Sequence, residues 1–427
     1  MNVVVVGMGK IGLPLAVQYA RKGMNVVGVD ISSETIKLIN SGIPPFPEEE
    51  DLDTYLKLEV ENGKLIASDD LEESVKNADV IVVVIPLFVD ENASPDFSGM
   101  DKVTAVIGKN LRSGTLICYE TTLPIGTTRD RFSKKIIEES GLKIGQDFYV
   151  VFSPERVLTG RVFSDLRRYP KIVGGVTPAC TAKGKLFYES VLDFDSRDDL
   201  EKKNGVWALE SAESAEFVKL AETTYRDVNI GLANEFASYA HKINLDIYEI
   251  IESANSQPYS HLHKPGISVG GHCIPIYPQF YMWSDKEAKI VSAARNTNSS
   301  MPFRSISNLE HKLGSLEEFN VLILGISYRS HVKETAFSGA LELKRLLLER
   351  KARVFAKDPL YSDSEIEELG FSAYQRSEIF DVVILHTDHE IFSQLEPGSF
   401  ENLKAYIDGR NFLSHWRRKI PNLEVTF

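Results

Sequence analysis

The sequence predicts an α/β protein with two doubly wound, Rossmann-like domains joined by a helical region that contains one long central helix. Three observations lead to this prediction. Short apolar runs, each followed by turn residues, alternate with helical segments in both halves of the chain. A glycine-rich turn directly follows the first apolar run. Between the halves lies a long segment without proline whose apolar residues recur at helical spacing.

The composition limits the class of protein. With 427 residues the chain is long enough for two or three domains, and 43% hydrophobic and 26% charged residues are typical of a globular protein. The net charge of −13 argues against nucleic acid or an anionic membrane as the main partner. Three cysteines make no disulfide framework, and no apolar run has the length of a transmembrane helix. We therefore expect a cytoplasmic protein.

The first element in the chain is a buried strand at residues 2–6, followed by the turn Gly7-Met-Gly9-Lys-Ile-Gly12. A helix over 13–22 and a second strand over 25–29, which ends at Asp30, complete the pattern. The glycines allow a pyrophosphate to approach the N-terminus of the helix, and the acid suits a ribose 2′-hydroxyl. Asp30 would repel a 2′-phosphate, so the cofactor expected is NAD rather than NADP. A glycine turn in another kind of α/β protein is the alternative.

Residues 44–64 are rich in proline and acid, and we expect a connection and a solvated helix there, with Glu48–Asp51 as a solvated face. Strands are then expected at 79–85, 115–119, 148–152 and 171–173. Ligands of an open parallel sheet bind beyond the carboxyl ends of its strands. Thr122 and Glu155 follow two of these strands, so both are expected on the side of the glycine turn, although loop residues of these types are usually solvated or capping.

The segment from about residue 210 to 243 predicts a long helix, which would be the hinge between domains and a possible dimer seam. Lys219 and Thr223 are four residues apart and so share a face of it. A surface lysine whose stem covers apolar residues is the alternative reading of Lys219. Residues 245–256 predict a further helix.

A rigid loop is predicted over residues 266–278. Gly270 and Gly271 permit a tight turn or a close approach, and Pro275 and Pro278 stiffen the exit, so the loop is suited to presenting Cys273. A buried, inert cysteine beside a tight turn explains this stretch equally well by itself.

A third region is expected to begin after Met301-Pro302. Strands at 320–325, 353–356, 381–385 and 404–407, with a helix over 338–351, predict a second doubly wound sheet. Its first turn has a single glycine, so it should not bind a dinucleotide as the first does, although it could hold a mononucleotide. The expected domains are 1–195 for NAD, 206–300 for the central helical region and 301–427 for the second sheet.

Seven stretches in order resemble the UDP-glucose/GDP-mannose dehydrogenase family over essentially the whole chain. They are GMGKIGLPLA (7–16), ETTLPIGTT (120–128), SPERVLTGR (153–161), AEFVKLAETTYRDVNIGLANE (215–235), GGHCIPIYP (270–278), TDH (387–389) and DGRN (408–411). The wording of the third and fifth is similar to the branch that acts on UDP-N-acetylhexosamines, UDP-N-acetyl-D-mannosamine among them. The UDP-glucose branch usually has Gly-Gly-Ser-Cys in that loop and a second glutamate where this chain has Thr159.

The resemblance implies oxidation of a sugar C6 alcohol to a carboxylate in two steps, with two NAD⁺ consumed and no metal. It implies Cys273 as nucleophile, Glu155 as the group that activates the hydrolytic water, Lys219 as the oxyanion donor, and Thr122 and Thr223 as further catalytic residues. Its implied cofactor-binding residues are Gly7, Gly9, Lys10, Ile11, Gly12, Asp30, Pro86 and Thr122. Its implied substrate-binding residues are Arg156, Lys219, His272, Gly270, Arg329 and Arg410. A homodimer or higher homo-oligomer through the long helix is also implied.

Three positions depart from the family pattern. Thr223 stands where the family usually has Asn, Tyr277 where an Asp is usual, and Ala336 where relatives often have Arg. Other sugars of the same reaction class, UDP-glucose and UDP-N-acetylglucosamine, remain open. So do a two-domain β-hydroxyacid dehydrogenase, which needs no cysteine, and a non-catalytic nucleotide-binding protein. The NADH released per substrate separates these readings.

Overall fold

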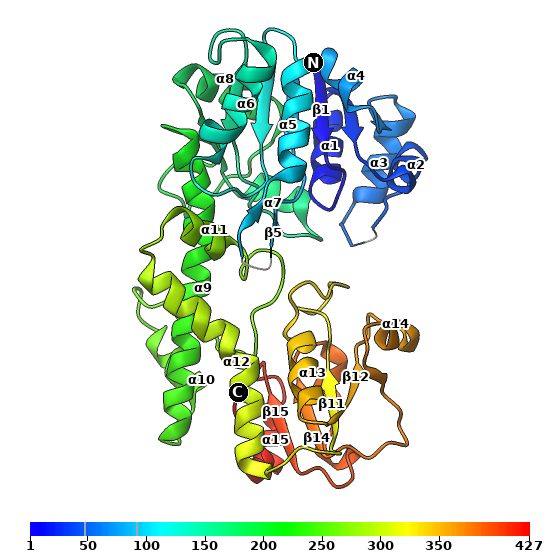
Figure 1. Ribbon diagram of the computed structural model, residues 1–427, viewed down its shortest axis with the longest axis vertical. Coiled ribbons are helices and arrows are strands. Elements are labelled where there is room, and N and C mark those ends of the chain that lie inside the picture. Colours follow the sequence, from blue (N-terminus) through cyan, green and yellow to red (C-terminus); the bar gives the residue numbers. More distant parts are fainter. Residues whose placement is uncertain (47, 91–92) are drawn as a thin grey trace. The chain divides into compact units, whose positions relative to one another are not determined.

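The computed structural model describes residues 1–46, 48–90 and 93–427. These residues form two compact units, Met1–Ala221 and Glu222–Phe427. The boundary between the units falls inside the 31-residue helix α9 (Ala212–Lys242), drawn in green in Figure 1. The long central helix that the spacing of apolar residues predicted is therefore confirmed.

The first unit is built on an eight-stranded sheet with the order β10-β9-β8-β7-β4-β1-β2-β3. Its strands are β1 Asn2–Val6, β2 Asn25–Val29, β3 Leu65–Ser68, β4 Val80–Val83, β7 Leu116–Tyr119, β8 Tyr149–Phe152, β9 Lys171–Gly175 and β10 Val206–Leu209. Every residue of β4 and β7 is buried, as expected for strands covered by helices on both faces. A small antiparallel pair, β5 (Phe88–Val89) and β6 (Pro95–Asp96), stands apart from this sheet.

Helices cover the first sheet on both sides. They are α1 Gly12–Arg21, α2 Ser33–Asn40, α3 Leu52–Glu61, α4 Leu71–Lys76, α5 Ser98–Asn110, the π-helix η1 Thr128–Ser133, α6 Lys134–Ser140, α7 Val162–Arg168 and α8 Pro178–Val191. Helix α1 is buried from Gly12 to Ala20 because α3 and α7 pack against it. The core of this unit joins the valines of β1 to α1, α8 and the apolar face of α3.

One strand of the first sheet departs from the expected parallel pattern. Strand β9 runs antiparallel to β8, with Phe152 opposite Gly174, and only β10 beside it is again parallel to β9. The Ser153 hydroxyl, directly after β8, donates to the carbonyl of Ile172 at 2.7 Å, so the chain re-enters the sheet at the end where it left. As a result Lys171, the first residue of β9, lies at the same edge of the sheet as the loop that follows β8.

The second unit contains a five-stranded, wholly parallel sheet with the order β13-β12-β11-β14-β15. Its strands are β11 Asn320–Leu324, β12 Arg353–Lys357, β13 Ser372–Ala373, β14 Val382–Leu385 and β15 Ala405–Asp408. Its helices are α10 Ile247–Ala254, α11 Tyr277–Ser284, α12 Lys289–Leu313, α13 Gly339–Glu349, α14 Asp363–Glu368 and α15 Ser414–Lys419, with 3₁₀ turns η2 Glu390–Gln394, η3 Pro397–Ser399 and η4 Pro421–Leu423. Both sheets thus share the strand order 3-2-1-4-5 of a doubly wound nucleotide-binding fold.

Helix α12 continues through Pro302 without a break. Buried polar contacts join it to α9: the Asn298 amide donates to the Asp227 carboxylate and Arg295 pairs with that carboxylate, both at 2.8 Å. The Asn234 amide of α9 in turn donates to the side-chain carbonyl of Asn298 at 2.8 Å. These contacts fix the two helices against each other.

Candidate active site

The glycines of the turn after β1 have three different roles in the first unit. Gly7 has φ +96°, a backbone conformation that favours glycine. A Cβ on Gly12 would lie 1.8 Å from the carbonyl oxygen of Gly7, so Gly12 is required for α1 to begin close to the turn. A Cβ on Gly9 would meet no heavy atom within 4 Å. Gly9 therefore leaves open space at the N-terminus of α1, where a pyrophosphate could approach the backbone.

Asp30 lies directly beside this turn. One of its carboxylate oxygens accepts from the Met8 amide at 2.8 Å and the other from the Ser32 amide at 2.9 Å. Two backbone amides therefore orient the carboxylate, and each oxygen keeps a further lone pair for a ribose hydroxyl. Lys10 in the turn is paired with Glu48 at 3.3 Å. The described residues around the glycine turn thus fit an NAD-binding site.

The expectation that Glu48–Asp51 form a solvated face is wrong for Glu49. Glu49 is 6% exposed, and its carboxylate accepts from the amides of Gly160 at 2.7 Å and Val162 at 2.5 Å. Burial raises the pKa of Glu49, while these amides oppose the rise. The acidic segment therefore holds the loop that leads into α7 in place. Its acidic composition was the reason for expecting a surface stretch.

The loop after β7 contains Thr122, which is buried, and it is held by a carboxylate from α9. Glu216 accepts from the amides of Gly126 at 2.6 Å and Thr128 at 2.8 Å, and from the Thr128 hydroxyl at 2.7 Å. Burial raises the pKa of Glu216 to about 7. Pro86, after β4, is exposed. Sequence reasoning missed Glu216 because nothing in a helical sequence distinguishes a buried glutamate from a solvated one.

Glu155 lies in the loop after β8, and two lysines contact this residue. The Lys219 ammonium of α9 donates to the Glu155 main-chain carbonyl at 2.6 Å. The Lys171 ammonium forms an ion pair with the Glu155 carboxylate and a second one with Glu120 at 2.8 Å. A guanidinium nitrogen of Arg156 donates to the carbonyl of Pro170 at 3.1 Å. The structure thus places the Lys219 ammonium in contact with the main chain of Glu155, two residues for which the family resemblance implies catalytic roles.

Lys171 and Glu120 were missed by the sequence reading. Both are charged residues at the end of an otherwise apolar strand, Lys-Ile-Val-Gly-Gly for the first and Leu-Ile-Cys-Tyr-Glu for the second. A charge in such a position has to be paired when the strand is buried, and that signal could have identified both residues.

In the second unit the Cys273 loop is presented on the surface. Cys273 is exposed, whereas Cys118 and Cys180 are buried. Its carbonyl accepts from the Tyr277 amide at 2.9 Å, which joins the loop to the start of α11. The expectation of a buried thiol at Cys273, the alternative for this stretch, is therefore wrong.

The two glycines before Cys273 allow the loop to lie against Tyr328. A Cβ on Gly270 would be 2.8 Å from the Tyr328 Cβ, and one on Gly271, which has φ +90°, would be 2.9 Å from the Tyr328 ring. The Gly271 amide donates to the carbonyl of Ala336 at 3.1 Å, and a ring nitrogen of His272 contacts Glu334 at 2.7 Å. Residues 328–337 of the second unit therefore support the Cys273 loop.

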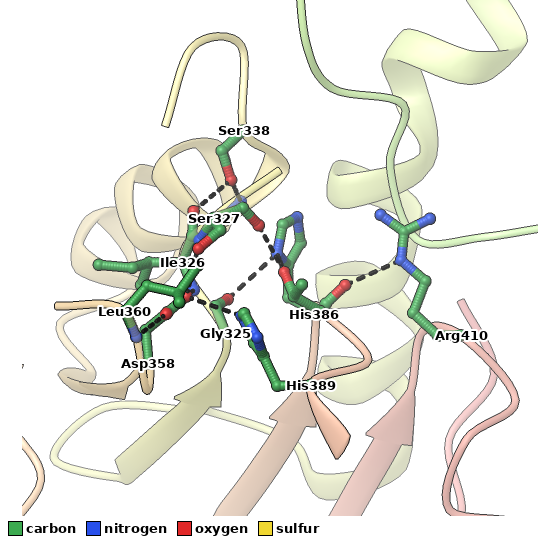
Figure 2. A network of polar contacts seen from close by, with 11 residues as sticks. Gly325, Ile326, Ser327, Ser338, Asp358, Leu360, His386, His389 and Arg410 are labelled. Atoms are coloured by element: carbon green, nitrogen blue, oxygen red, sulfur yellow. Dashed lines mark hydrogen bonds and ion pairs between the residues drawn. The ribbon is translucent and has the colours of Figure 1, made fainter. Parts of the chain in front are cut away.

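A second turn, after β11, repeats the geometry of the first with a different outcome (Figure 2). The Gly325 amide donates to the Lys357 carbonyl at 2.8 Å, as the Gly7 amide does to Val29. Asp358 then accepts from the amides of Ile326 and Ser327 and from the Ser327 hydroxyl, and a ring nitrogen of His389 contacts it at 3.2 Å. Although burial alone would raise it, these hydrogen bonds hold the pKa of Asp358 well below its usual range.

Arg410 lies near this network, after β15. Its Nε donates to the carbonyl of His386 at 2.9 Å, and its Nη atoms have no hydrogen-bond partner within the described chain (Figure 2). Burial lowers the pKa of Arg410. Burial and the neighbouring Arg410 charge lower the pKa of His386 to about 3, so this imidazole is neutral and can accept from the Ser268 hydroxyl, 3.0 Å away. Arg329 lies on the segment that supports the Cys273 loop.

The predicted residues therefore fall into two sets. The first unit holds the glycine turn, Asp30, Thr122, Glu155 and Lys219, all at the carboxyl edge of its sheet or on α9. The second unit holds Thr223, which is buried, and Cys273, His272, Arg329 and Arg410. No cluster of three potential metal ligands occurs in residues 1–46, 48–90 and 93–427. None of the helices in the described part of the chain combines the length and apolar character needed to cross a bilayer.

Three domain families match this chain in order. They are the UDP-glucose/GDP-mannose dehydrogenase family NAD binding domain at residues 1–192, central domain at 213–300 and UDP binding domain at 322–415. The UDP-N-acetyl-D-mannosamine dehydrogenase of Pyrococcus horikoshii is 34% identical over 425 residues, which cover 97% of this chain and 96% of that protein.

Solved structures agree with the sequence comparison. A UDP-D-ManNAc dehydrogenase from Pyrococcus horikoshii superimposes with a TM-score of 0.85 at 33% identity, covering 96% of both chains. The UDP-N-acetyl-mannosamine dehydrogenase of Staphylococcus aureus gives a TM-score of 0.81 at 31% identity, covering 96% of this chain and 95% of the other. The chain therefore belongs to the UDP-glucose/GDP-mannose dehydrogenase family of NAD-dependent nucleotide-sugar dehydrogenases.

Proposed function

We propose that this protein oxidises the C6 alcohol of UDP-N-acetyl-D-mannosamine to the uronic acid, with two NAD⁺ consumed per sugar. The observation that carries the proposal is the exposed Cys273 on a loop fixed by Gly270 and Gly271 against Tyr328. A reaction that stopped at the ketone or aldehyde would need no nucleophile. The choice of sugar rests on the names of the relatives that match the chain over its length.

The residues of the first unit fit the oxidation of the alcohol. Bound NAD⁺ supplies a hydride acceptor for carbon six in each oxidation. Thr122 helps to hold the water that takes the hydroxyl proton, and the Lys219 ammonium stabilises the oxygen as it becomes negative. Asp30, with both oxygens oriented by backbone amides, accepts from the adenosine ribose.

The later steps use Cys273 and Glu155. The thiolate adds to the aldehyde carbon and forms a C–S bond, which gives a thiohemiacetal whose oxidation leaves a thioester. Glu155 takes a proton from water as the water oxygen bonds to the thioester carbon. The C–S bond then breaks, the carboxylate product leaves, and the thiolate is regenerated on Cys273. Lys219 can stabilise the oxyanion of each addition.

In the second unit Arg410 is the residue best suited to the nucleotide diphosphate. Its guanidinium is held through Nε by the His386 carbonyl, which leaves both Nη groups directed elsewhere. A planar guanidinium with two open N–H groups matches the geometry of phosphate oxygens. Arg329, His272, Gly270 and Arg156 are further contacts proposed for the substrate.

A panel of nucleotide sugars tests the proposed function. Purified protein is incubated with NAD⁺ and UDP-N-acetyl-D-mannosamine, UDP-N-acetylglucosamine or UDP-glucose, and NADH is counted per sugar consumed. We expect two NADH per UDP-N-acetyl-D-mannosamine and slower reaction with the others. Two NADH from UDP-glucose at a higher rate would reassign the substrate, and one NADH or none from every sugar would contradict the reaction.

The variant Cys273→Ser is the matched control for the nucleophile. A hydroxyl at this position is a weaker nucleophile and a poorer leaving group than a thiolate, so the second oxidation should stop or an ester should accumulate, which intact-protein mass would detect. Wild-type turnover by this variant would show that Cys273 forms no covalent intermediate.

We also propose that a second copy of the chain packs along α9. Tyr225, Leu232, Phe236 and Tyr239 are exposed apolar side chains whose spacing of seven, four and three residues places them on one stripe of the helix, and the exposed Ile243 directly follows its end. Such a stripe can pair with itself about a two-fold axis. Light scattering should report a dimer of the 47.8 kDa chain that dissociates in Tyr239→Glu. Leu186→Glu, at an exposed position on α8, is the control and should leave the dimer intact.

A further inference from the structure

A buried network of charges lies next to Glu155 in the first unit. Glu120, whose side chain is fully buried, accepts from the Tyr188 hydroxyl at 2.7 Å, from the Tyr19 hydroxyl at 3.3 Å and from the Lys171 ammonium at 2.8 Å. The side chain of Lys171 is 5% exposed, and its ammonium also contacts the Glu155 carboxylate, which is 10% exposed. Two carboxylates from different strand ends therefore share one ammonium.

Three neutral groups and two further cations lie beside this network, and one of these cations, Arg156, donates to the carbonyl of Pro170 at 3.1 Å. Burial and the Glu120 charge raise the pKa of Tyr19, and burial likewise raises that of Tyr188, so both phenols stay protonated and donate. Burial raises the pKa of the Cys118 thiol. The Lys219 ammonium donates to the main-chain carbonyl of Glu155. Lys171 is thus a cation paired directly with the Glu155 carboxylate.

The network holds Lys171 in place through contacts other than its ion pair with Glu155. Two phenols fix the Glu120 carboxylate, which in turn fixes the ammonium, and the Lys171 backbone is part of β9. The position of the ammonium is therefore set by contacts that do not involve Glu155. Burial lowers the pKa of Lys171, and the Glu120 charge opposes this effect, so the second carboxylate helps to keep the lysine protonated.

We propose that Lys171 is a positioning residue that orients the Glu155 carboxylate for the activation of water and keeps it ionised at lower pH. The proposal rests on the role proposed above for Glu155. It extends that role to two residues, Lys171 and Glu120, which touch neither substrate nor cofactor in the proposed reaction. A purely structural ion pair that ties β7 to β9 is the competing explanation.

The two explanations predict different pH profiles. A cation beside a carboxylate favours its charged form, so loss of the ammonium should raise the pH at which Glu155 becomes a competent base. A structural pair would alter folding and leave the pH profile of thioester hydrolysis unchanged. The oxidation steps precede hydrolysis and provide an internal reference in the same sample.

The experiment uses the full-length enzyme with NAD⁺ and UDP-N-acetyl-D-mannosamine in single turnover at a series of pH values. Rapid-mixing absorbance follows NADH, and quenched samples are analysed by intact-protein mass for the thioester on Cys273. In Lys171→Met the acid limb of hydrolysis should move up by about one pH unit or more, with thioester accumulating below it. Lys171→Arg should restore the wild-type limb because it keeps the charge. An unmoved limb in Lys171→Met would overturn the proposal.

A second variant guards against a folding defect, because Lys171→Met leaves two buried carboxylates without a cation. Lys171→Met combined with Glu120→Gln removes one charge of each sign and is expected to show the same upward shift. An unmoved limb in this double variant would likewise overturn the proposal. The variant Glu155→Gln distinguishes a failure of the role proposed for Glu155 from a failure of the inference about Lys171. If Glu155→Gln hydrolyses the thioester as the wild type does, the role proposed for Glu155 is wrong. If Glu155→Gln stalls while Lys171→Met and the double variant keep the wild-type acid limb of hydrolysis, only the inference about Lys171 is wrong.

Discussion

At the scale of a single residue, we predict that the Asp30 carboxylate selects the dinucleotide that this protein uses. Its two oxygens are oriented by the amides of Met8 and Ser32, and the residue directly follows the second strand of the NAD binding domain. A 2′-phosphate at the same place would face a fixed negative charge, and like charges in contact cost several kcal/mol.

We therefore expect NAD⁺ to be preferred over NADP⁺ by on the order of 10²-fold in kcat/KM, since each factor of ten is about 1.4 kcal/mol. Asp30→Asn should reduce this preference, mainly through faster reaction with NADP⁺, because it removes the charge and keeps one acceptor. Initial rates with both cofactors at matched concentrations are the measurement. Equal rates with NAD⁺ and NADP⁺ in the wild type would show that Asp30 does not contact the ribose.

Lys219 and Glu155 lie together but should act at different times. Lys219 is useful whenever oxygen becomes negative, so Lys219→Ala should slow NADH formation from the first turnover, by ~10²–10³-fold as for a lost oxyanion donor. Glu155 is needed only when water is deprotonated, so Glu155→Gln should give a rapid burst of NADH and then a stall with the thioester on Cys273. Rapid-mixing absorbance and intact mass distinguish these traces. Identical slow traces without a burst or adduct would contradict the division of roles.

Some residues of the candidate site can be identified from short sequence motifs, whereas others can be identified only from contacts in the folded structure. The positive φ of Gly7, the place of Asp30 beside the glycine turn and the exposure of Cys273 were predictable, because short sequence patterns encode local backbone geometry. The ion pair of Lys171 with Glu120 was not predictable, because it joins strand ends that the expected parallel order of the sheet did not bring together.

Helix α9 is the element that joins the residue sets, and its first turns carry a pH-sensitive contact. Glu216 has a pKa raised by burial to about 7, against about 4.5 for an ordinary glutamate. The folded state therefore binds more protons than the unfolded state between these values, and the free energy of unfolding should fall as pH rises through this window. At one pKa unit per 1.36 kcal/mol the full effect is about 3 kcal/mol.

Urea unfolding of the wild type and Glu216→Gln at pH 5 and pH 8 tests this prediction. The wild type should lose stability relative to the variant as the pH rises, since only the wild type carries the titrating carboxylate. Glu213→Gln is the control: the pKa of Glu213 is lowered, with the Arg129 hydrogen bond opposing burial, so its contribution changes only below its ordinary pKa. A constant difference between wild type and Glu216→Gln across this range would contradict the assignment.

Most helices and strands were predictable from the periodicity of apolar residues, whereas the direction of one strand was not. The spacing of apolar residues predicted helix α9 and strands β1, β2, β4, β7 and β8, and the structure has all six of these elements there. The antiparallel β9 was not predictable, because a short apolar run has the same pattern in either direction and the Ser153 contact that returns the chain is non-local. Pro302 suggested a boundary, yet α12 continues through it with Asn298 and Arg295 bonded to α9.

At the scale of the whole molecule the fold repeats one plan twice. The first five strands of each sheet have the same order, and both sheets place an aspartate after the second strand where it accepts from the backbone of the first turn. The sequence predicted both sheets and that only the first would bind a dinucleotide, from the number of glycines in each turn. It did not predict that Asp358 would be satisfied by protein donors, since Ser327 and His389 reach it through tertiary structure.

The repeated turn has a consequence for amide hydrogen exchange. The Met8 amide donates to Asp30 and the Ile326 amide donates to Asp358, both at 2.8 Å, so each turn has an amide in the same chemical setting. Gly9 leaves the first turn open to a ligand. In the second turn, the protein's own donors already occupy the carboxylate of Asp358. Added NAD⁺ should therefore slow deuterium uptake in the peptide that spans Gly7–Gly12 and leave the peptide around Ile326 unchanged. The second turn would then serve as a built-in reference for the first, and equal slowing of both peptides would show that cofactor binding spreads beyond its own sheet.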